Sequence, residues 1–349
     1  MMIRYLKQEE KIESRKLWAE VFSEDSDSFM DYYFSDRVKK SKVLTAWKDE
    51  TMAAMLHRNP YDVVMKDRLC KVDYIAGVAT HPDCRHQGYM SRLLSRCFTD
   101  MYMERMGFCF LVPVDPAIYT PFDFTYISQL PAASLNEKGR QLSRRAFLER
   151  SDECREVAMF VGRQLEQRYE VYTLRDEDYY RDLGREVRSD KGDLLLLSTR
   201  DERECLAGVW AYYGEDAANV RELIGLPDYI KESGTAKPYA MGRIVHLEQF
   251  VSGICLKEDS PVSEMELVME VKDRFIHQND GVFKWKLNRE GSVLIPMERG
   301  DGLIPQLSIG IKELTSWLFG YSRPPFSPEQ KELLNRIRPF KGVFFNEVT

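Results

Sequence analysis

One segment constrains the fold of this chain more than any other: an apolar run followed by a polar loop and an amphipathic helix. Residues 72–79 are apolar and rich in β-branched residues, which predicts a buried strand. From Met90 onward, apolar residues recur at i, i+3, i+4, i+7, i+8 and i+11, which predicts a helix that ends at Gly107. Residues 108–114 predict a second buried strand. Strand, loop, helix and strand in this order form an α/β unit.

The residues before this unit predict a short strand, two helices and three more strands. The strand is expected at residues 3–6, the helices at 11–22 and after Asp27, and the further strands at 42–47, 51–57 and 61–65. Turn chemistry at Asn59-Pro60 is expected to separate the last two strands. Two helices inserted after the first strand are a specific feature of this order.

A length of 349 residues predicts two or three domains, and we expect boundaries at 1–130, 131–238 and 239–349. The middle section restarts the pattern of the first but has no glycine-bearing basic loop after its last strand. Its helices are expected at 146–169 and 176–187, and its strands at 169–174, 194–198, 206–213 and 220–226. The last section is predicted to have helices at 246–253 and 309–319, strands at 265–271, 282–287 and 292–295, and a final helix capped by Ser327 and Gln330. Its apolar end, residues 342–349, predicts a docked tail.

Charge and composition exclude several classes of protein. A net charge of −6 gives no global reason to coat nucleic acid or an anionic membrane. The apolar runs are far shorter than the roughly 20 residues that cross a bilayer, and the first residues lack a signal-peptide core. Seven scattered cysteines without CxxC spacing and five dispersed histidines predict neither disulfides nor a metal site. We therefore expect a soluble, cytoplasmic protein.

The loop before the long helix carries the residues that point to chemistry. It reads Thr80-His81-Pro82-Asp83-Cys84-Arg85-His86-Gln87-Gly88-Tyr89-Met90. A helix N-terminus offers unpaired N–H groups and a partial positive charge; Gly88 allows close approach of an anion, and Arg85 adds a fixed charge. The loop is neither a P-loop nor a Rossmann turn. Arg-x-x-Gly alone is more typical of a simple capped loop, but its place between strand and helix favours a pyrophosphate site.

This layout resembles the GNAT superfamily of N-acetyltransferases, whose [RQ]xxGx[GA] loop holds the pyrophosphate of acetyl-CoA. Within it, the chain resembles the Eis-type acetyltransferases. The resemblance rests on the Val-Ala…His-Pro…Arg-x-x-Gly run, on the pair Ile118-Tyr119 and on the aromatic-rich tail. It implies an α+β fold: an N-terminal GNAT domain, a second degenerate GNAT-like domain without the cofactor loop, and a C-terminal domain like a sterol carrier protein.

The resemblance also implies where acetyl-CoA binds. Val78 and Thr80 would bracket the strand that pairs with the pantetheine amides. The pyrophosphate cradle would consist of Arg85, His86, Gln87, Gly88, Tyr89 and Met90. Met90 replaces the small residue of the general motif, which implies some local widening. No metal is implied.

Two groups are expected to move protons by the same resemblance. Tyr119 would be the general acid that protonates the departing thiolate, with Tyr126 as the alternative. The α-carboxylate of Thr349 would be the general base that takes the proton of the amine. Without the family, the sequence favours a buried tyrosine at position 119 whose hydroxyl is satisfied, and the tail is equally a hydrophobic latch. The polar step Asn346-Glu347 leaves the register of the tail open.

The leading hypothesis is an acyltransferase that moves acetyl from acetyl-CoA directly to a primary amine, such as an aminoglycoside-like polyamine or lysine. The rival is a catalytically decayed binding module for an apolar ligand or protein partner. The residues after Tyr119 favour this rival, because they replace the glycine-rich turn of the family. The family implies a homo-oligomer, a trimer or hexamer. We expect no nucleic-acid and no membrane partner.

Overall fold

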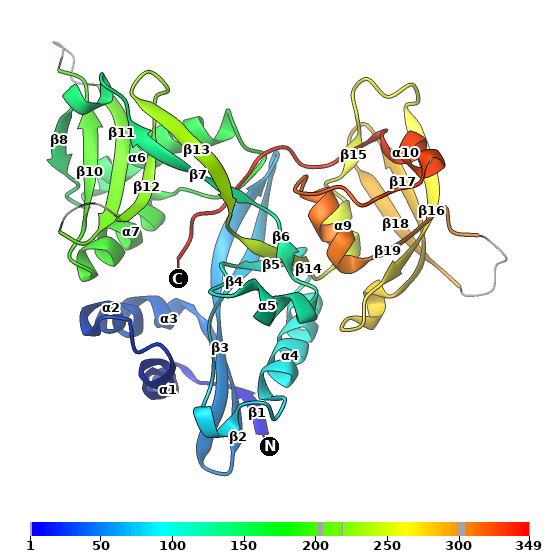
Figure 1. Ribbon diagram of the computed structural model, residues 1–349, viewed down its shortest axis with the longest axis horizontal. Helices are drawn as coiled ribbons and strands as arrows, with labels where there is room; N and C mark the ends of the chain where they lie inside the picture. The colour runs from blue at the N-terminus through cyan, green and yellow to red at the C-terminus, as the bar shows by residue number, and fades with distance from the viewer. Residues whose placement is uncertain (1, 201–204, 216, 218, 299–303, 349) are drawn as a thin grey trace.

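The centre of the computed structural model, which describes residues 2–200, 205–215, 217, 219–298 and 304–348, is a nine-stranded sheet (Figure 1). Seven strands follow the order β1-β2-β3-β4-β5-β14-β6, while β9 pairs with β3 and β21 with β9. Their bounds are β1 (Met2–Tyr5), β2 (Lys42–Lys48), β3 (Thr51–Met65), β4 (Arg68–Thr80), β5 (Phe108–Leu111), β6 (Thr125–Tyr126), β9 (Val171–Thr173), β14 (Met241–Ile244) and β21 (Val343–Phe344). Only the β4–β5 and β9–β21 pairs are parallel. Because β9, β14 and β21 come from later in the chain, all three sections contribute to this sheet.

Helices cover both faces of the sheet (Figure 1). On one face lie η1 (Gln8–Glu13), α1 (Ser14–Val21), α2 (Asp27–Tyr32), η2 (Tyr33–Arg37) and α3 (Val38–Lys40); on the other lies α4 (Tyr89–Met103). Neighbouring residues of β2 show the alternation: Val43 packs under α1 and α2, whereas Leu44 packs under α4. The predicted order of two helices, strands and then strand–loop–helix–strand is confirmed.

The predicted turn at Asn59-Pro60 is wrong, because β3 runs through both residues. On the edge of β3 away from β4, pairing with β2 ends at Arg58 and pairing with β9 begins at Val63. A proline, which cannot donate to a strand ladder, is tolerated where that edge carries no partner strand. Asn59 forms no turn, because its buried side chain accepts a 2.6 Å hydrogen bond from Ser41 Oγ.

The middle section forms a four-stranded antiparallel sheet in the order β12-β11-β10-β8, against which two helices pack. Its elements are β8 (Ser143–Ala146), α6 (Ser151–Glu166), α7 (Glu177–Ser189), β10 (Asp193–Ser198), β11 (Leu206–Tyr213) and β12 (Asn219–Gly225). The predicted strands are confirmed, but the first helix is shorter than expected: β8 ends at Ala146, and α6 begins at Ser151 and ends at Glu166. A ribbon of β7 (Gln129–Leu135) and β13 (Ile230–Pro238), with η5 (Gly139–Gln141) beside it, has no clear sequence pattern and was not predicted.

The last section contains a second four-stranded sheet in the order β18-β17-β16-β19, and a small pair β15–β20. Its elements are α8 (Leu247–Val251), β15 (Cys255–Leu256), β16 (Glu264–Lys272), η6 (His277–Asn279), β17 (Gly281–Asn288), β18 (Ser292–Met297), β19 (Leu307–Gly310), α9 (Ile311–Leu318), α10 (Pro328–Leu334) and β20 (Ile337–Arg338). The predicted capping box is present, since Ser327 and Gln330 bond reciprocally. Within the described residues, no helix is long and apolar enough to cross a membrane.

Candidate active site

The strands β4 and β5 run side by side only briefly. Their parallel pairing joins Asp73 to Cys109 and Tyr74 to Phe110. Strand β5 ends at Leu111, whereas β4 continues for six residues beyond Tyr74 beside β3. The two strands therefore separate in the middle of the sheet. The part of β4 that has left β5 leads directly into the loop before α4.

A bulge marks the part of β4 that has left β5. The register against β3 shifts so that β4 carries one extra residue between Ala76 and Ala79. Gly77 has a φ of +54°, and a Cβ there would lie 2.3 Å from Cζ3 of Trp18, so only glycine fits. A bulge redirects the backbone of the residues beside it. Val78, expected to contact the cosubstrate, follows directly and is half-buried.

The predicted loop lies at the N-terminus of α4. Residues 85–88 are exposed, and Gly88 is the N-cap of the helix with a φ of +78° and no side-chain cap. Arg85 Nε donates to the carbonyl of Thr80 at 3.4 Å. Gln87 Nε2 donates to the carbonyl of Asp83 at 2.9 Å. The first bond ties the loop to the end of β4, and the second closes the loop on itself.

This loop fits an anionic group. The 15-residue helix α4 presents its first N–H groups without a side-chain cap. A Cβ on Gly88 would have nothing within 4 Å, so the backbone there faces open space. His86 also takes a left-handed conformation, with φ +60°. Tyr89 is buried and Met90 half-buried against the core, so these two residues can offer a ligand chiefly their backbone.

Tyr119 ends α5 (Pro116–Tyr119), which follows β5 and begins at the N-cap Asp115. Its ring packs edge-on against Phe124 at 6.0 Å, and burial raises the pKa of its hydroxyl to about 12. The hydroxyl is therefore protonated at neutral pH, as an acid must be. Tyr126 lies on β6 at the edge of the sheet and stacks on Tyr321.

The unusual turn after Tyr119 is held firmly. Residues 120–122 form η4 (Thr120–Phe122), and Asp123 closes it in the left-handed conformation, φ +63°. Buried Arg243 donates to the carbonyl of Phe122 at 3.1 Å, and Arg274 bonds the carbonyl of Pro121. Aspartate tolerates the left-handed region better than most residues, which explains how this turn forms without glycine.

The hydroxyl of Tyr74 holds the tail of the chain. Burial raises the pKa of the Tyr74 hydroxyl well above its usual value, and the nearby hydroxyls of Tyr239, Tyr61 and Tyr119 add to that rise. The Tyr74 hydroxyl donates to the carbonyl of Val348 at 3.0 Å. The tail therefore reaches the point where β4 and β5 separate.

The tail is docked, as predicted. After β21, Phe345 is buried and stacks on Phe110 with ring centroids 4.4 Å apart. Three consecutive carbonyl oxygens are then each held by a different side chain. Asn346 O accepts from Arg221 Nη1 at 2.5 Å, Glu347 O from the Tyr239 hydroxyl at 3.2 Å, and Val348 O from Tyr74. Thr349, the expected base, lies outside the described residues.

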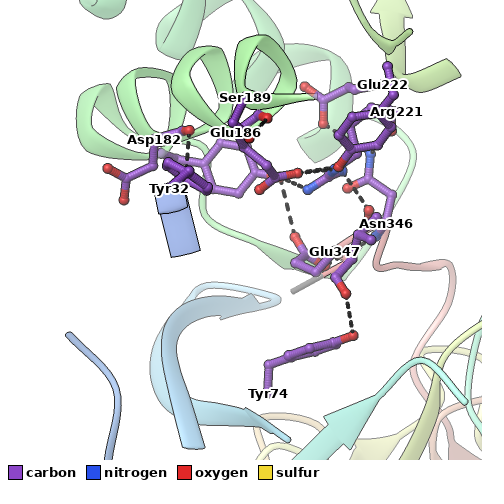
Figure 2. A network of polar contacts seen from close by, with 12 residues as sticks. Tyr32, Tyr74, Asp182, Glu186, Ser189, Arg221, Glu222, Asn346 and Glu347 are labelled. Carbon is purple, nitrogen blue, oxygen red and sulfur yellow. Dashed lines mark hydrogen bonds and ion pairs between the residues drawn. The ribbon is translucent and has the colours of Figure 1, made fainter. Parts of the chain in front are cut away.

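A buried polar network from the middle section holds the side chains of the tail (Figure 2). Arg175 Nη1 donates to Glu347 Oε1 at 3.0 Å, and Nη2 to Asn346 Oδ1 at 2.5 Å. Arg175 also pairs with Glu222 at 3.2 Å, and Arg221 with Glu186 at 2.9 Å. Arg175, Glu222 and Glu347 have fully buried side chains. Buried ions need partners, so the network and the tail depend on each other.

A cavity of about 140 Å³ lies beside this network. Its walls come from α2, η2, α3, β3, α7, the loop before α7 and β12, and they include Tyr32, Arg37, Tyr61, Glu186 and Arg221. A larger cavity of about 660 Å³ adjoins it along β3, where both are lined by Pro60, Tyr61 and Asp62, and extends to the ion pairs of Arg58. None of the predicted site residues lines either cavity. The smaller one is lined by Arg221, which binds the tail, and by Tyr61, whose ring packs edge-on against Tyr74, so we place the chemistry beside it.

The predictions missed the residues that hold the tail: Tyr74, Arg175, Arg221 and Tyr239. The one available signal was the polar pair Asn346-Glu347 inside an apolar tail, because buried polar groups require partners. The part of the chain that the structure describes contains no cluster of three or more side chains suited to a metal.

Comparison with protein families identifies two domains. Residues 2–127 match the family described as "Acetyltransferase (GNAT) domain", and residues 248–338 match "Sterol carrier protein domain". The chain thus combines the two kinds of domain that the sequence predicted, and its α+β fold is confirmed. No curated protein matches the chain significantly.

Solved structures share the fold along the whole chain. A conserved protein from Enterococcus faecalis V583, described as a probable N-acyltransferase, matches with 13% identity and a TM-score of 0.73, covering 98% of this chain and 99% of that one. A GCN5-related N-acetyltransferase from Anabaena variabilis matches with 15% identity and a TM-score of 0.67, covering 97% and 94%. Eis1 from Mycobacterium abscessus matches with 12% identity and a TM-score of 0.66, covering all of both chains. The domain match supports acyl transfer in general.

Proposed function

We propose that the protein is an N-acetyltransferase that moves acetyl from acetyl-CoA directly to a primary amine, such as a polyamine, an aminoglycoside-like molecule or lysine. One observation carries this proposal: the tail is held at Tyr74 through the carbonyl of Val348, where β4 and β5 separate, and Tyr119 lies on the helix that follows β5. A candidate proton donor thus follows β5, Val348 is held on β4, and the loop before α4 lies at the end of the same strand β4. Residue 349 is one residue beyond the carbonyl that Tyr74 binds.

The chain offers a suitable place for each part of acetyl-CoA. The uncapped start of α4, Arg85 and the open space at Gly88 suit the pyrophosphate. The free edge of β4 around Val78 and Thr80 suits the pantetheine amides, which pair like a strand. A backbone N–H next to the bulge suits the thioester oxygen, where charge develops during transfer.

The proposed reaction needs no nucleophile from the protein. The amine nitrogen attacks the thioester carbon, the new C–N bond forms, and the C–S bond breaks. The carboxylate of Thr349 takes the proton that the amine loses, and Tyr119 donates a hydrogen bond, then a proton, to the departing sulfur. A thiol has a pKa near 8.5, so its thiolate leaves readily, and the tyrosine serves mainly as a hydrogen-bond donor to the sulfur.

The rival, a binding module for an apolar ligand, finds less support. The inner face of the β16–β19 sheet is filled by its own side chains; Leu267, Met269 and Trp285 are each at most 1% exposed. These residues belong to a core shared with β5 and α9. The C-terminal domain therefore packs against the first sheet through this shared core. The turn after Tyr119, which favoured the rival, is ordered by Arg243.

Thiol release from acetyl-CoA tests the proposal. Purified protein is incubated with acetyl-CoA and a panel of polyamines, aminoglycosides and lysine, and free thiol is followed by absorbance. We expect release that depends on the amine, with an N-acetylated product by mass spectrometry. Calorimetry should show acetyl-CoA binding that weakens in Arg85→Met. Absence of acetyl-CoA binding by the unmodified protein would overturn the proposal.

A further inference from the structure

The cavity beside the tail has a charge pattern that the proposed function does not yet use. It is small, about 140 Å³, and the helices of the first domain face α7 of the middle section across it. Figure 2 shows Tyr32, Asp182 and Glu186 on one side of this region and Tyr74 on the other, with Glu347 between them. A molecule in this cavity would lie next to the tail.

Most charged groups of the cavity already have partners. Lys40 pairs with Asp182 at 2.6 Å, and Arg221 pairs with Glu186 and binds the tail carbonyl. Asp176 caps α7 by accepting from the N–H of Tyr179 at 2.7 Å. The acidic lining is thus largely neutralised from within, and gives little attraction to a polycation.

Among the described basic residues of the cavity, Arg37 is the exception. Its guanidinium lies over the ring of Tyr61, 4.5 Å from the centroid, and forms no ion pair with a residue that the structure describes. Its Nη2 is buried and has no hydrogen-bond partner. A buried donor without a partner is costly, more so when it is charged. The fork of a guanidinium matches a carboxylate, which accepts two parallel hydrogen bonds.

The ring of Tyr61, over which Arg37 lies, packs against Tyr74, the residue that holds the tail. Tyr61 lies 6.3 Å from Tyr74, measured between ring centroids, and Tyr74 holds the carbonyl of Val348. Asp62, the next residue of β3, also lines the cavity and forms no ion pair within the described part of the chain. It lies beyond the 4.0 Å ion-pair distance from Arg37. A free cation and a free carboxylate that do not touch suit a ligand that carries both charges.

We infer that this cavity is the acceptor site and that Arg37 binds a carboxylate of the acceptor, so that the preferred substrate is a small molecule with both an amine and a carboxylate, an amino acid or a similar zwitterion. This inference rests on the proposed function and narrows its substrate class. The carboxylate is anchored on Arg37, and the amine extends along Tyr61 toward Tyr74 and the chain end.

Matched pairs of acceptors test the inference. Glycine, 4-aminobutyrate and lysine are each compared with the corresponding amide, which keeps the amine and lacks the carboxylate. For at least one pair, kcat/KM is expected to be about 10- to 100-fold higher for the acid, the worth of a charge-assisted hydrogen bond to a buried partner. Equal values, or higher values for the amide, in all three pairs would overturn the inference.

Two substitutions locate the effect. Arg37→Met keeps the bulk of the side chain and should remove the preference for the acid while changing the rate with the amide little. Arg37→Lys should retain part of it. The control is Arg15→Met, which removes an arginine of α1 that pairs with Asp31 outside the cavity and should leave the preference intact. A loss with Arg37→Met that is equal for acid and amide would contradict a carboxylate site.

Binding measured without acetyl-CoA separates this inference from the proposed function. Calorimetry with lysine and with lysinamide should show tighter binding of lysine, lost in Arg37→Met. If lysine binds in this way but no amine is acetylated, the site stands and the proposed activity fails. If amines are acetylated without regard to a carboxylate, the activity stands and the site assignment fails.

Discussion

Replacing Arg175 with methionine tests whether the middle section positions the tail. Arg175 is fully buried and contacts Glu222, Glu347 and Asn346. Methionine fills similar space but carries no donor. Glu222 keeps its bonds from the Tyr180 hydroxyl, 2.9 Å, and from the amide of Asn346, 3.1 Å. The carboxylate of Glu347 loses its only ion pair among the described residues.

The size of the effect follows from that burial. Removing one partner of a buried ion pair typically costs about 3–5 kcal/mol, because the other charge stays uncompensated. The tail can escape this cost by leaving its site, so the penalty appears as local opening. Since about 1.4 kcal/mol is a factor of ten, the opening should become roughly 100-fold to a few thousand-fold more frequent.

Hydrogen exchange of the C-terminal peptide, followed by mass spectrometry, measures this opening directly. Arg175→Met should speed exchange at Phe345 and Asn346 by that factor and lower kcat, while the KM for acetyl-CoA stays unchanged. Adding Glu347→Gln removes the unpaired charge and should recover part of the protection. Arg155→Met, which removes an exposed arginine paired with Glu177 in the same section, is the control and should alter neither measurement.

Either of two results would refute this reasoning. Unchanged exchange in Arg175→Met would mean that the tail is held by its apolar residues alone. Strictly additive effects of Arg175→Met and Glu347→Gln would mean that the two groups do not interact, because contacting residues give coupling energies of about 0.5–3 kcal/mol.

Three further predictions concern the proton carriers and the buried histidine. Tyr119→Phe should lower kcat about 10- to 150-fold, the worth of a hydrogen bond to a developing charge, with acetyl-CoA affinity by calorimetry unchanged; an unchanged kcat would remove Tyr119 from the mechanism. Residues added after Thr349 should reduce turnover, whereas the same residues added at the N-terminus should not; full activity of the extended protein would count against the carboxylate base. Burial lowers the pKa of His57 from 6.5 to about 3, so the unfolded chain binds its proton first and stability falls as the pH drops from about 6.5 toward 3, by up to about 5 kcal/mol. Chemical denaturation at several pH values should show a flatter acid limb for His57→Gln, and an identical limb would contradict this account.

Local patterns predicted the parts of the site that are local in sequence. The helix periodicity from Met90 and the glycine at position 88 give α4 and its open N-terminus, because both depend on neighbours within one or two turns. The capping box at Ser327 was predictable for the same reason. Residues 342–349 indicated a docked tail because half of them are Val or Phe.

What the sequence could not give are pairings between distant segments. Arg175 lies 172 residues from Glu347, and nothing in the sequence around either residue indicates the other. The strands β9, β14 and β21 join the first sheet from later sections, so no window of the sequence shows that sheet whole. The sequence predicts a turn at Pro60, because it does not show that the edge of β3 carries no partner strand there. That gap depends on where the pairing with β2 ends and the pairing with β9 begins.

The polar pair Asn346-Glu347 fixes the register of the tail in the structure. In the sequence alone, the same pair leaves that register open. The stacking of Phe345 on Phe110 attaches the tail but tolerates small shifts, because apolar contacts are not directional. A slip of one residue along β9 would turn each side chain to the opposite face and move the carboxylate of Glu347 away from Arg175. That slip would strand a buried charge, at a cost of about 3–5 kcal/mol. The pair therefore holds Val348 at one position beside Tyr74, and a base supplied by the residue after it requires that restriction.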